Sequence, residues 1–130
     1  MAGWSDLAAY VRSRYKIAHE QPNMIKLLFE VDGLRSQVVL LWHLTLVNDT
    51  EEWVQIESAV GELGSIDLAR ALREIGETVC GGLATLGDLV TFRHSVPLLN
   101  LNINEFERPL ALVTATADHL ERTLTGADEY

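Results

Sequence analysis

The stretch that decides the fold is Ile25–Val60, IKLLFEVDGLRSQVVLLWHLTLVNDTEEWVQIESAV. It contains three apolar runs separated by two short polar segments, which are Asp32-Gly33 and Asn48–Glu52. An Asp-Gly pair between apolar runs is a strong hairpin signal, because a two-residue primed turn needs the positive φ that glycine accepts. The stretch therefore predicts a three-stranded antiparallel meander.

The two turns also predict the register of this meander. Counting outward from Asp32-Gly33 places Leu27 opposite Val38, and counting outward from the second turn places Leu40 opposite Val60. Both counts put Val38 and Leu40 on the same sheet face, whereas a slip of one residue would move them to the other face. The side chains predicted to be buried across the whole chain are Leu27, Phe29, Val38, Leu40, Trp42, Leu44, Val54, Ile56, Phe92 and Val113.

Apolar residues recur at helical spacing in three other segments. They predict helices over Asp6–Tyr15, Ile66–Ile75 and Ile103–Leu124. A second hairpin is predicted around Gly87-Asp88, and residues 16–23 are interpreted as a connector. The resulting fold class is α+β: a five-stranded antiparallel sheet with flanking helices, in the order αβββαββα.

The predicted helix boundaries rest on capping residues. Ser5 and Ser65 precede the first two helices and are predicted as their N-caps. Asn102 is followed three residues later by Glu105, which is typical of a capping box at the start of the last helix. Gly126 is predicted to end that helix and to leave a short acidic tail.

Length, charge and cysteine content limit the classes of function. A chain of 130 residues is expected to form a single domain over residues 1–130. A lone Cys80 and the absence of a signal-peptide pattern predict a reducing, cytoplasmic location. The net charge of −9 argues against nucleic acid and fits either plain solubility or a basic or amphipathic protein partner. No apolar run is long enough to predict insertion into a membrane.

Side chains with catalytic or metal-binding chemistry form no recognisable local pattern. None of His19, His43, His94 and His119 lies in a spacing typical of a metal site, so no metal or cofactor is expected. Ser95 follows His94 directly, and adjacent strand residues point to opposite faces, so the two form no dyad. The residues therefore predict a protein that is not an enzyme.

The predicted outer face of the meander is too apolar for a solvated surface and too polar for a core. Such a face indicates a partner, which is a peptide, a second copy of the chain or a covering helix. The predicted helix Ile66–Ile75 is the candidate cover, and its own apolar residues are the competing contact surface. The predicted peptide or dimer contacts are Leu28, Val39, Leu41, His43, Trp53, Leu68 and Leu72.

Four segments of the chain resemble YbjN-like domains. They are RSQVV at Arg35–Val39, VQIESAVGEL at Val54–Leu63, FRHSVPLLNL at Phe92–Leu101 and ADHLERTLTGADEY at Ala117–Tyr130. The order of elements, the size and the acidity are also similar to type III secretion chaperones of the CesT type. The resemblance implies a curved sheet with helices that binds extended or amphipathic segments of client proteins, often as a homodimer. It implies no catalytic residues.

Two functions of different classes follow from these observations. The first is a non-enzymatic chaperone or adaptor that holds peptide segments of a client protein. The second is a homodimeric regulatory or interaction domain without chaperone activity. A small hydrolase that uses His94 and Cys80 is the remaining alternative.

Overall fold

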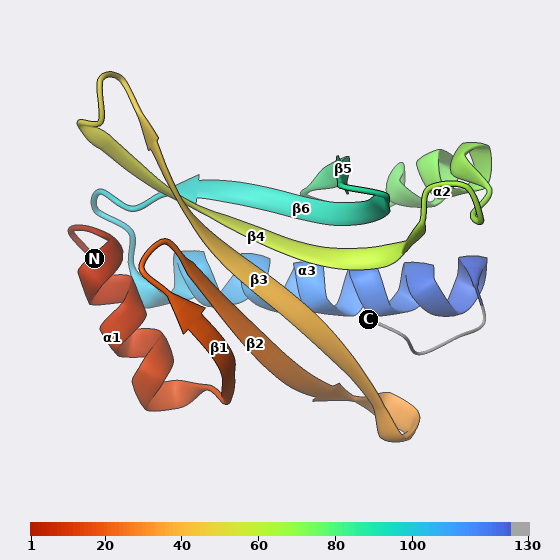
Figure 1. The fold of residues 1–130 in the computed structure, drawn as a ribbon, viewed down its shortest axis with the longest axis horizontal. Coiled ribbons are helices and arrows are strands. Elements are labelled where there is room, and N and C mark those ends of the chain that lie inside the picture. Colours follow the sequence, from red (N-terminus) through yellow and green to blue (C-terminus); the bar gives the residue numbers. More distant parts are fainter. Residues whose placement is uncertain (126–130) are drawn as a thin grey trace.

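The computed structural model describes residues 1–125, which form one antiparallel sheet with three helices (Figure 1). The predicted helix end at Gly126 and the acidic tail lie outside the described residues. In the sheet the strands lie in the order β1-β2-β3-β4-β6-β5. The strands are β1 Ile17–Gln21, β2 Met24–Val31, β3 Arg35–Leu46, β4 Glu51–Glu62, β5 Gly82–Leu86 and β6 Leu89–Pro97. The helices are α1 Trp4–Arg14, α2 Leu68–Ile75 and α3 Ile103–Leu124.

The predicted α+β class is confirmed, but the sheet has six strands and the order is αββββαββα. The additional strand is β1, which lies in the segment that we interpreted as a connector. Its sequence, IAHEQ, is mostly polar and exposed, so it carries no alternation of apolar residues that would predict a strand. Backbone pairing with β2 holds it at the sheet edge, with Glu20 opposite Ile25.

The first hairpin turns through three residues, Asp32–Leu34, instead of the predicted two. Gly33 and Leu34 both have positive φ, 74° and 63°, so the left-handed backbone extends one residue beyond the glycine. Leu27 consequently pairs with Val39, one residue later than predicted.

The second hairpin also differs from its predicted register. Val47, Asn48 and Asp49 all have positive φ, and strand pairing begins immediately outside residues 47–50, with Leu46 opposite Glu51. Leu44 therefore pairs with Trp53, three residues earlier on β4 than predicted. Because both register errors are odd numbers of residues, they invert the two faces of β3 and leave the faces of β2 and β4 as predicted.

The predicted burial of β3 is accordingly wrong. Val38, Leu40, Trp42 and Leu44 were expected in the core but lie half-buried on the other face. Their places in the core are taken by Val39 and Leu41, which are fully buried.

Helices α1 and α3 pack on the same face of the sheet (Figure 1). The core between them and the strands includes predicted residues Leu27, Val54, Ile56, Phe92 and Val113. Phe29, also predicted to be buried, is half-buried and meets Tyr15 edge-on, with the ring centroids 5.4 Å apart. The hydroxyls of Tyr10 and Tyr15 both donate to the Glu107 carboxylate, which joins α1 to α3.

The predicted start of α3 is confirmed together with its capping box. The Glu105 backbone N–H donates to Asn102 Oδ1 at 2.9 Å, and the Asn102 N–H donates to Glu105 Oε1 at 3.0 Å. The other two helices begin at different caps from those predicted. Gly3 precedes α1, and Asp67 precedes α2 and accepts from the Arg70 N–H at 3.0 Å.

Candidate functional site

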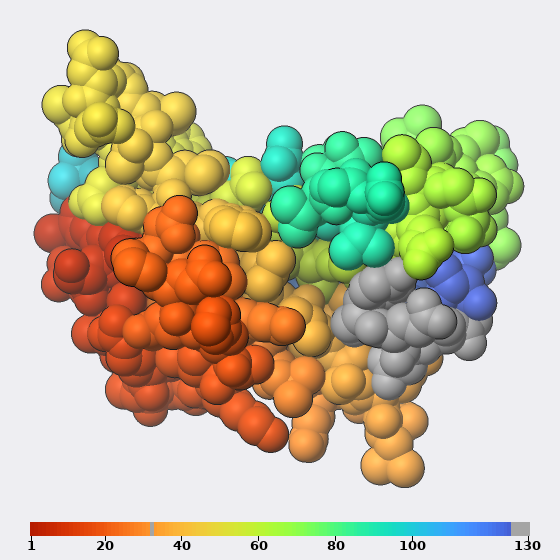
Figure 2. All heavy atoms as spheres, in the orientation of Figure 1, coloured from red at the N-terminus to blue at the C-terminus, as the bar shows by residue number. Residues whose placement is uncertain are grey.

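The sheet face opposite α1 and α3, which we call the open face, is the candidate site (Figure 2). None of the helices within residues 1–125 packs across its centre, because α2 lies beside α3 and β5. Most of its apolar side chains are partly accessible to solvent, although Met24, opposite Trp42, is only 7% exposed. The partly accessible ones include Leu28, Val38, Leu40, Trp42, Leu44, Trp53, Ala59 and Leu89. A surface of this composition is a typical contact area for another molecule.

Only two of the five predicted sheet contacts lie on the open face. Leu28 and Trp53 are there, half-buried, as the sequence predicts. The predicted placement of Val39, Leu41 and His43 is wrong, because the register of β3 points these three side chains toward the helices. Val39 and Leu41 are fully buried in the core and are therefore unavailable for contact in the folded chain.

His43 joins the β3–β4 hairpin to α1. Its ring stacks on the ring of Trp4, with the centroids 5.1 Å apart and the planes 15° from parallel. Its Nε2 lies 2.9 Å from Glu52 Oε1, and the same oxygen accepts from the Trp4 backbone N–H at 3.3 Å. The partner of His43 is therefore Glu52, on the helix side of β4. The position of His43 is fully explained by packing.

The centre of the open face holds a buried carboxylate, that of Glu57. The residue is 2% exposed, although it lies on the side of the sheet opposite α1 and α3. Its two oxygens accept from Trp42 Nε1–H at 3.0 Å and from Thr91 Oγ1–H at 2.7 Å.

Glu57 borders a hollow of about 240 Å³ on the open face. Figure 2 shows the face with β2 and β3 on one side and the β5–β6 hairpin on the other. Most of the lining is aliphatic, and its charged groups are one carboxylate and one ammonium. The lining residues are Lys26, Val38, Leu40, Glu57, Ala59, Leu86, Leu89 and Thr91.

The two predicted contacts on α2 are on the surface. Leu68 is 41% exposed and Leu72 is 60% exposed, whereas Ala71 on the adjacent side of the helix is buried. Helix α2 lies against the C-terminal half of α3, where Glu74 Oε2 is 3.6 Å from His119 Nε2. The interpretation of this helix as a cover for the open face is therefore wrong, and its apolar stripe forms a separate surface.

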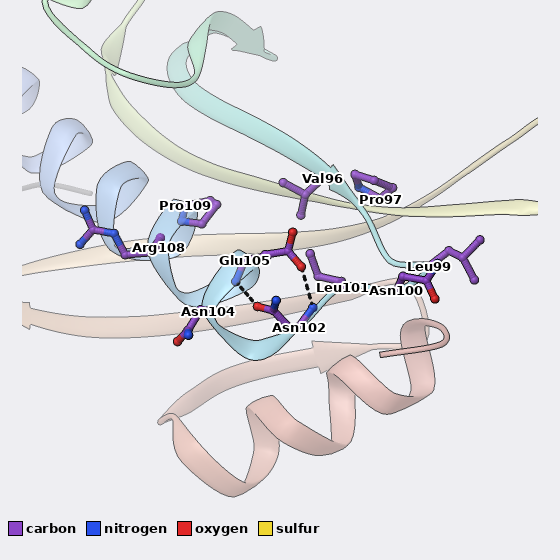
Figure 3. A pocket seen from close by; sticks show the side chains of 10 residues that line it. All are labelled: Val96, Pro97, Leu99, Asn100, Leu101, Asn102, Asn104, Glu105, Arg108 and Pro109. Atoms are coloured by element: carbon purple, nitrogen blue, oxygen red, sulfur yellow. Dashed lines mark hydrogen bonds between the residues drawn. The ribbon is translucent and has the colours of Figure 1, made fainter.

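A wider cleft of about 570 Å³ lies where β6 leads into α3 (Figure 3). Its apolar lining includes Val96 and Leu99, and its polar lining includes Asn102 and Glu105. The latter two are hydrogen-bonded to each other in the capping box of α3. Because these polar groups stabilise the helix start, the cleft is a weaker candidate than the open face.

The side chains with metal-binding or nucleophilic chemistry are the remaining candidates for a site in the described part of the chain. No group of three or more His, Cys, Asp or Glu side chains there is placed to hold a metal ion. Cys80 is half-buried, and this burial raises the pKa of its thiol. A nucleophilic cysteine requires the opposite change. His94 lies on the core side of β6, opposite Ile56.

We expect iodoacetamide to modify Cys80 more slowly in the folded protein than in the urea-unfolded chain. The raised pKa leaves a smaller fraction of reactive thiolate at about pH 8, and that fraction grows as the pH rises. Intact-mass measurements over time and pH would give both rates. Faster modification of the folded protein at the same pH would indicate an activated thiol and would support the hydrolase alternative.

No helix in the described part of the chain is long and apolar enough to cross a membrane. Comparison of the sequence with protein-family models and with curated proteins, and of the fold with solved structures, finds no match. The likeness to YbjN-like domains and to type III secretion chaperones therefore stays a prediction from the sequence.

Proposed function

We propose that this protein is a non-enzymatic chaperone or adaptor that holds an extended or amphipathic segment of a client protein on the open face. The observation that carries the proposal is the difference between the two sides of the sheet. One side is sealed by α1 and α3, whereas the other keeps aliphatic and indole surface accessible within residues 1–125. The resemblance stated above implies the same kind of partner. The lone Cys80 supports a cytoplasmic location as part of this proposal.

The open face offers the mixture of groups that binds amphipathic segments. Trp42 and Trp53 lie on neighbouring strands, and tryptophan is enriched among the residues that dominate binding energy. Trp53 Nε1–H donates to Glu51 Oε1 at 2.6 Å, so its indole is held in place beside the β3–β4 hairpin. Leu40 lines the hollow and lies two residues from Trp42 on the same face of β3, so a segment that crosses the sheet would contact it.

The test is selection of displayed random peptides on the immobilised protein, followed by affinity measurement for the enriched peptides. Leu40→Glu is expected to weaken their binding about tenfold or more, because it places a charge within the apolar contact area. Trp53→Ala should have a similar effect through loss of an aromatic contact. Circular dichroism would establish that both variants stay folded.

Leu72→Glu provides a matched control, since it introduces the same charge at an exposed leucine on α2. Peptide affinity should be unchanged in this variant. Recovery of no binding peptides, or equal affinity for the Leu40→Glu protein and the parent, would contradict the proposal.

The second candidate function is a homodimeric interaction domain, favoured by the apolar stripe of α2. Leu68 and Leu72 are exposed on consecutive turns, and Leu63 and Val79 are exposed in the flanking segments. If this stripe forms a dimer contact, Leu72→Glu should convert the dimer to a monomer in sedimentation velocity while Leu40→Glu leaves it intact. The reverse result would assign the dimer contact to the open face.

A further inference from the structure

We propose that the hollow beside Glu57 is a subsite for an organic cation with an aliphatic stem, which is the side chain of a lysine or arginine in a bound segment. The inference rests on the proposed function and names the residue type that the open face recognises. It goes beyond the general contact area, because it assigns one side chain of the partner to one place on the sheet.

The first argument is the burial of the Glu57 carboxylate. The residue is 2% exposed, and removal of a carboxylate from water is costly unless donors and a countercharge compensate it. Trp42 and Thr91 supply one neutral hydrogen bond to each oxygen, at 3.0 and 2.7 Å. Each oxygen keeps capacity to accept a second hydrogen bond. No salt bridge to Glu57 occurs among the ion pairs of the described residues.

The second argument is the shape and lining of the hollow. About 240 Å³ is room for one long side chain, and the walls are aliphatic apart from Lys26, Glu57 and Thr91. Lysine and arginine bury an aliphatic stem along apolar surface and present a charge at the tip. Val38 and Leu89 therefore fit the stem, and the Glu57 carboxylate fits the cationic head.

Two cations of the chain itself lie in the same row across the sheet. Lys26 pairs with Leu40, Leu40 with Glu57, and Glu57 with Arg93. Neither cation forms an ion pair with Glu57 within 4 Å, although Lys26 lines the hollow. The positive charge of Lys26 therefore repels an incoming cation, and removal of that charge should strengthen cation binding.

The indole of Trp42 provides a direct measurement, because its N–H donates to Glu57. The protein has three tryptophans, and the other two indoles donate elsewhere, Trp4 to the Pro22 carbonyl and Trp53 to Glu51. The probe is n-butylguanidinium, added to ¹⁵N-labelled protein, with n-butanol and n-pentanoate as neutral and anionic counterparts. We expect a saturable shift of the Trp42 indole N–H with the guanidinium, while the Trp4 and Trp53 signals act as internal references.

The isosteric Glu57→Gln variant should bind n-butylguanidinium about tenfold or more weakly, since it loses the charge-assisted hydrogen bond. Lys26→Met should bind it more tightly and serves as the second variant if Glu57→Gln does not fold. An equal shift with butanol would overturn the inference, because the hollow would then select only apolar groups. Preferential binding of pentanoate that is lost in Lys26→Met would also overturn it, since the hollow would then be an anion site.

The peptides selected on the open face separate this inference from the proposed function. Each lysine or arginine of a binding peptide would be replaced in turn by norleucine. At one position this replacement should weaken binding to the parent protein but leave binding to the Glu57→Gln variant unchanged. Peptides that require Leu40 and Trp53 but tolerate every such replacement would overturn the cation subsite and leave the proposed function standing.

Discussion

Leu41→Ala is expected to lower the free energy of unfolding by about 2–5 kcal/mol, the usual range for truncation of a fully buried leucine. The adjacent Leu40→Ala should cost about 1 kcal/mol or less, because Leu40 is half-buried on the open face and its loss leaves no closed cavity. Urea denaturation monitored by circular dichroism would give both values.

This pair of substitutions is a direct test of the β3 register. The two residues are neighbours of the same type, so chain position and chemistry are matched and only the sheet face differs. If Leu40→Ala proved the more damaging change, Leu40 would lie in the core, as counting from a two-residue turn at Asp32-Gly33 predicts. Equal costs would mean that the open face is covered in solution.

Arg35→Met is expected to destabilise the protein by about 3–5 kcal/mol, because it leaves two buried carboxylates without their shared guanidinium. Arg35 Nε lies 3.0 Å from Asp118 Oδ1, and its Nη2 lies 3.2 Å from Glu121 Oε1. The side chains of Asp118 and Glu121 are only 7% and 0% exposed. Thermal and urea unfolding would measure the loss.

Arg122→Met is the control for that prediction. Its guanidinium lies 3.3 Å from Asp118 Oδ2 but is half exposed, so its loss should cost about 1 kcal/mol or less. Neutralisation of the acids by Asp118→Asn and Glu121→Gln should recover part of the stability of Arg35→Met. A loss in Arg35→Met no larger than that in Arg122→Met would show that the ion pairs contribute little.

The helices were the most predictable part of the fold. The apolar period of residues 103–124 and the Asn102–Glu105 capping box are local signals, and α3 has the predicted bounds. Strand β1 was missed because its pairing with β2 depends on backbone groups, while its side chains carry no apolar pattern. The faces of β3 were inverted because an Asp-Gly pair is compatible with both two- and three-residue hairpin loops.

The same inversion of β3 placed Val39, Leu41 and His43 wrongly in the predicted site. The sequence between Arg35 and Leu46 is apolar at both alternating sets of positions, so it does not indicate which set is buried, and the prediction depended on counting from the turns. Leu28 and Trp53 were placed correctly because the two odd register errors cancel between β2 and β4. The burial of Glu57 depends on Trp42 and Thr91, which lie on two different neighbouring strands, so no local pattern in the sequence predicts it.

The alternation of core-facing and outward-facing residues along β3 has a consequence for how sequences of this type can diverge. Val39 and Leu41 face the core, and alternate residues Val38, Leu40 and Trp42 face outward. If the open face holds client segments as proposed, substitutions at Val38 and Leu40 would change which segments bind while the folding free energy is largely kept, whereas Trp42 is constrained by its hydrogen bond to Glu57. Variation among homologues is then expected to alternate along β3 with a period of two residues.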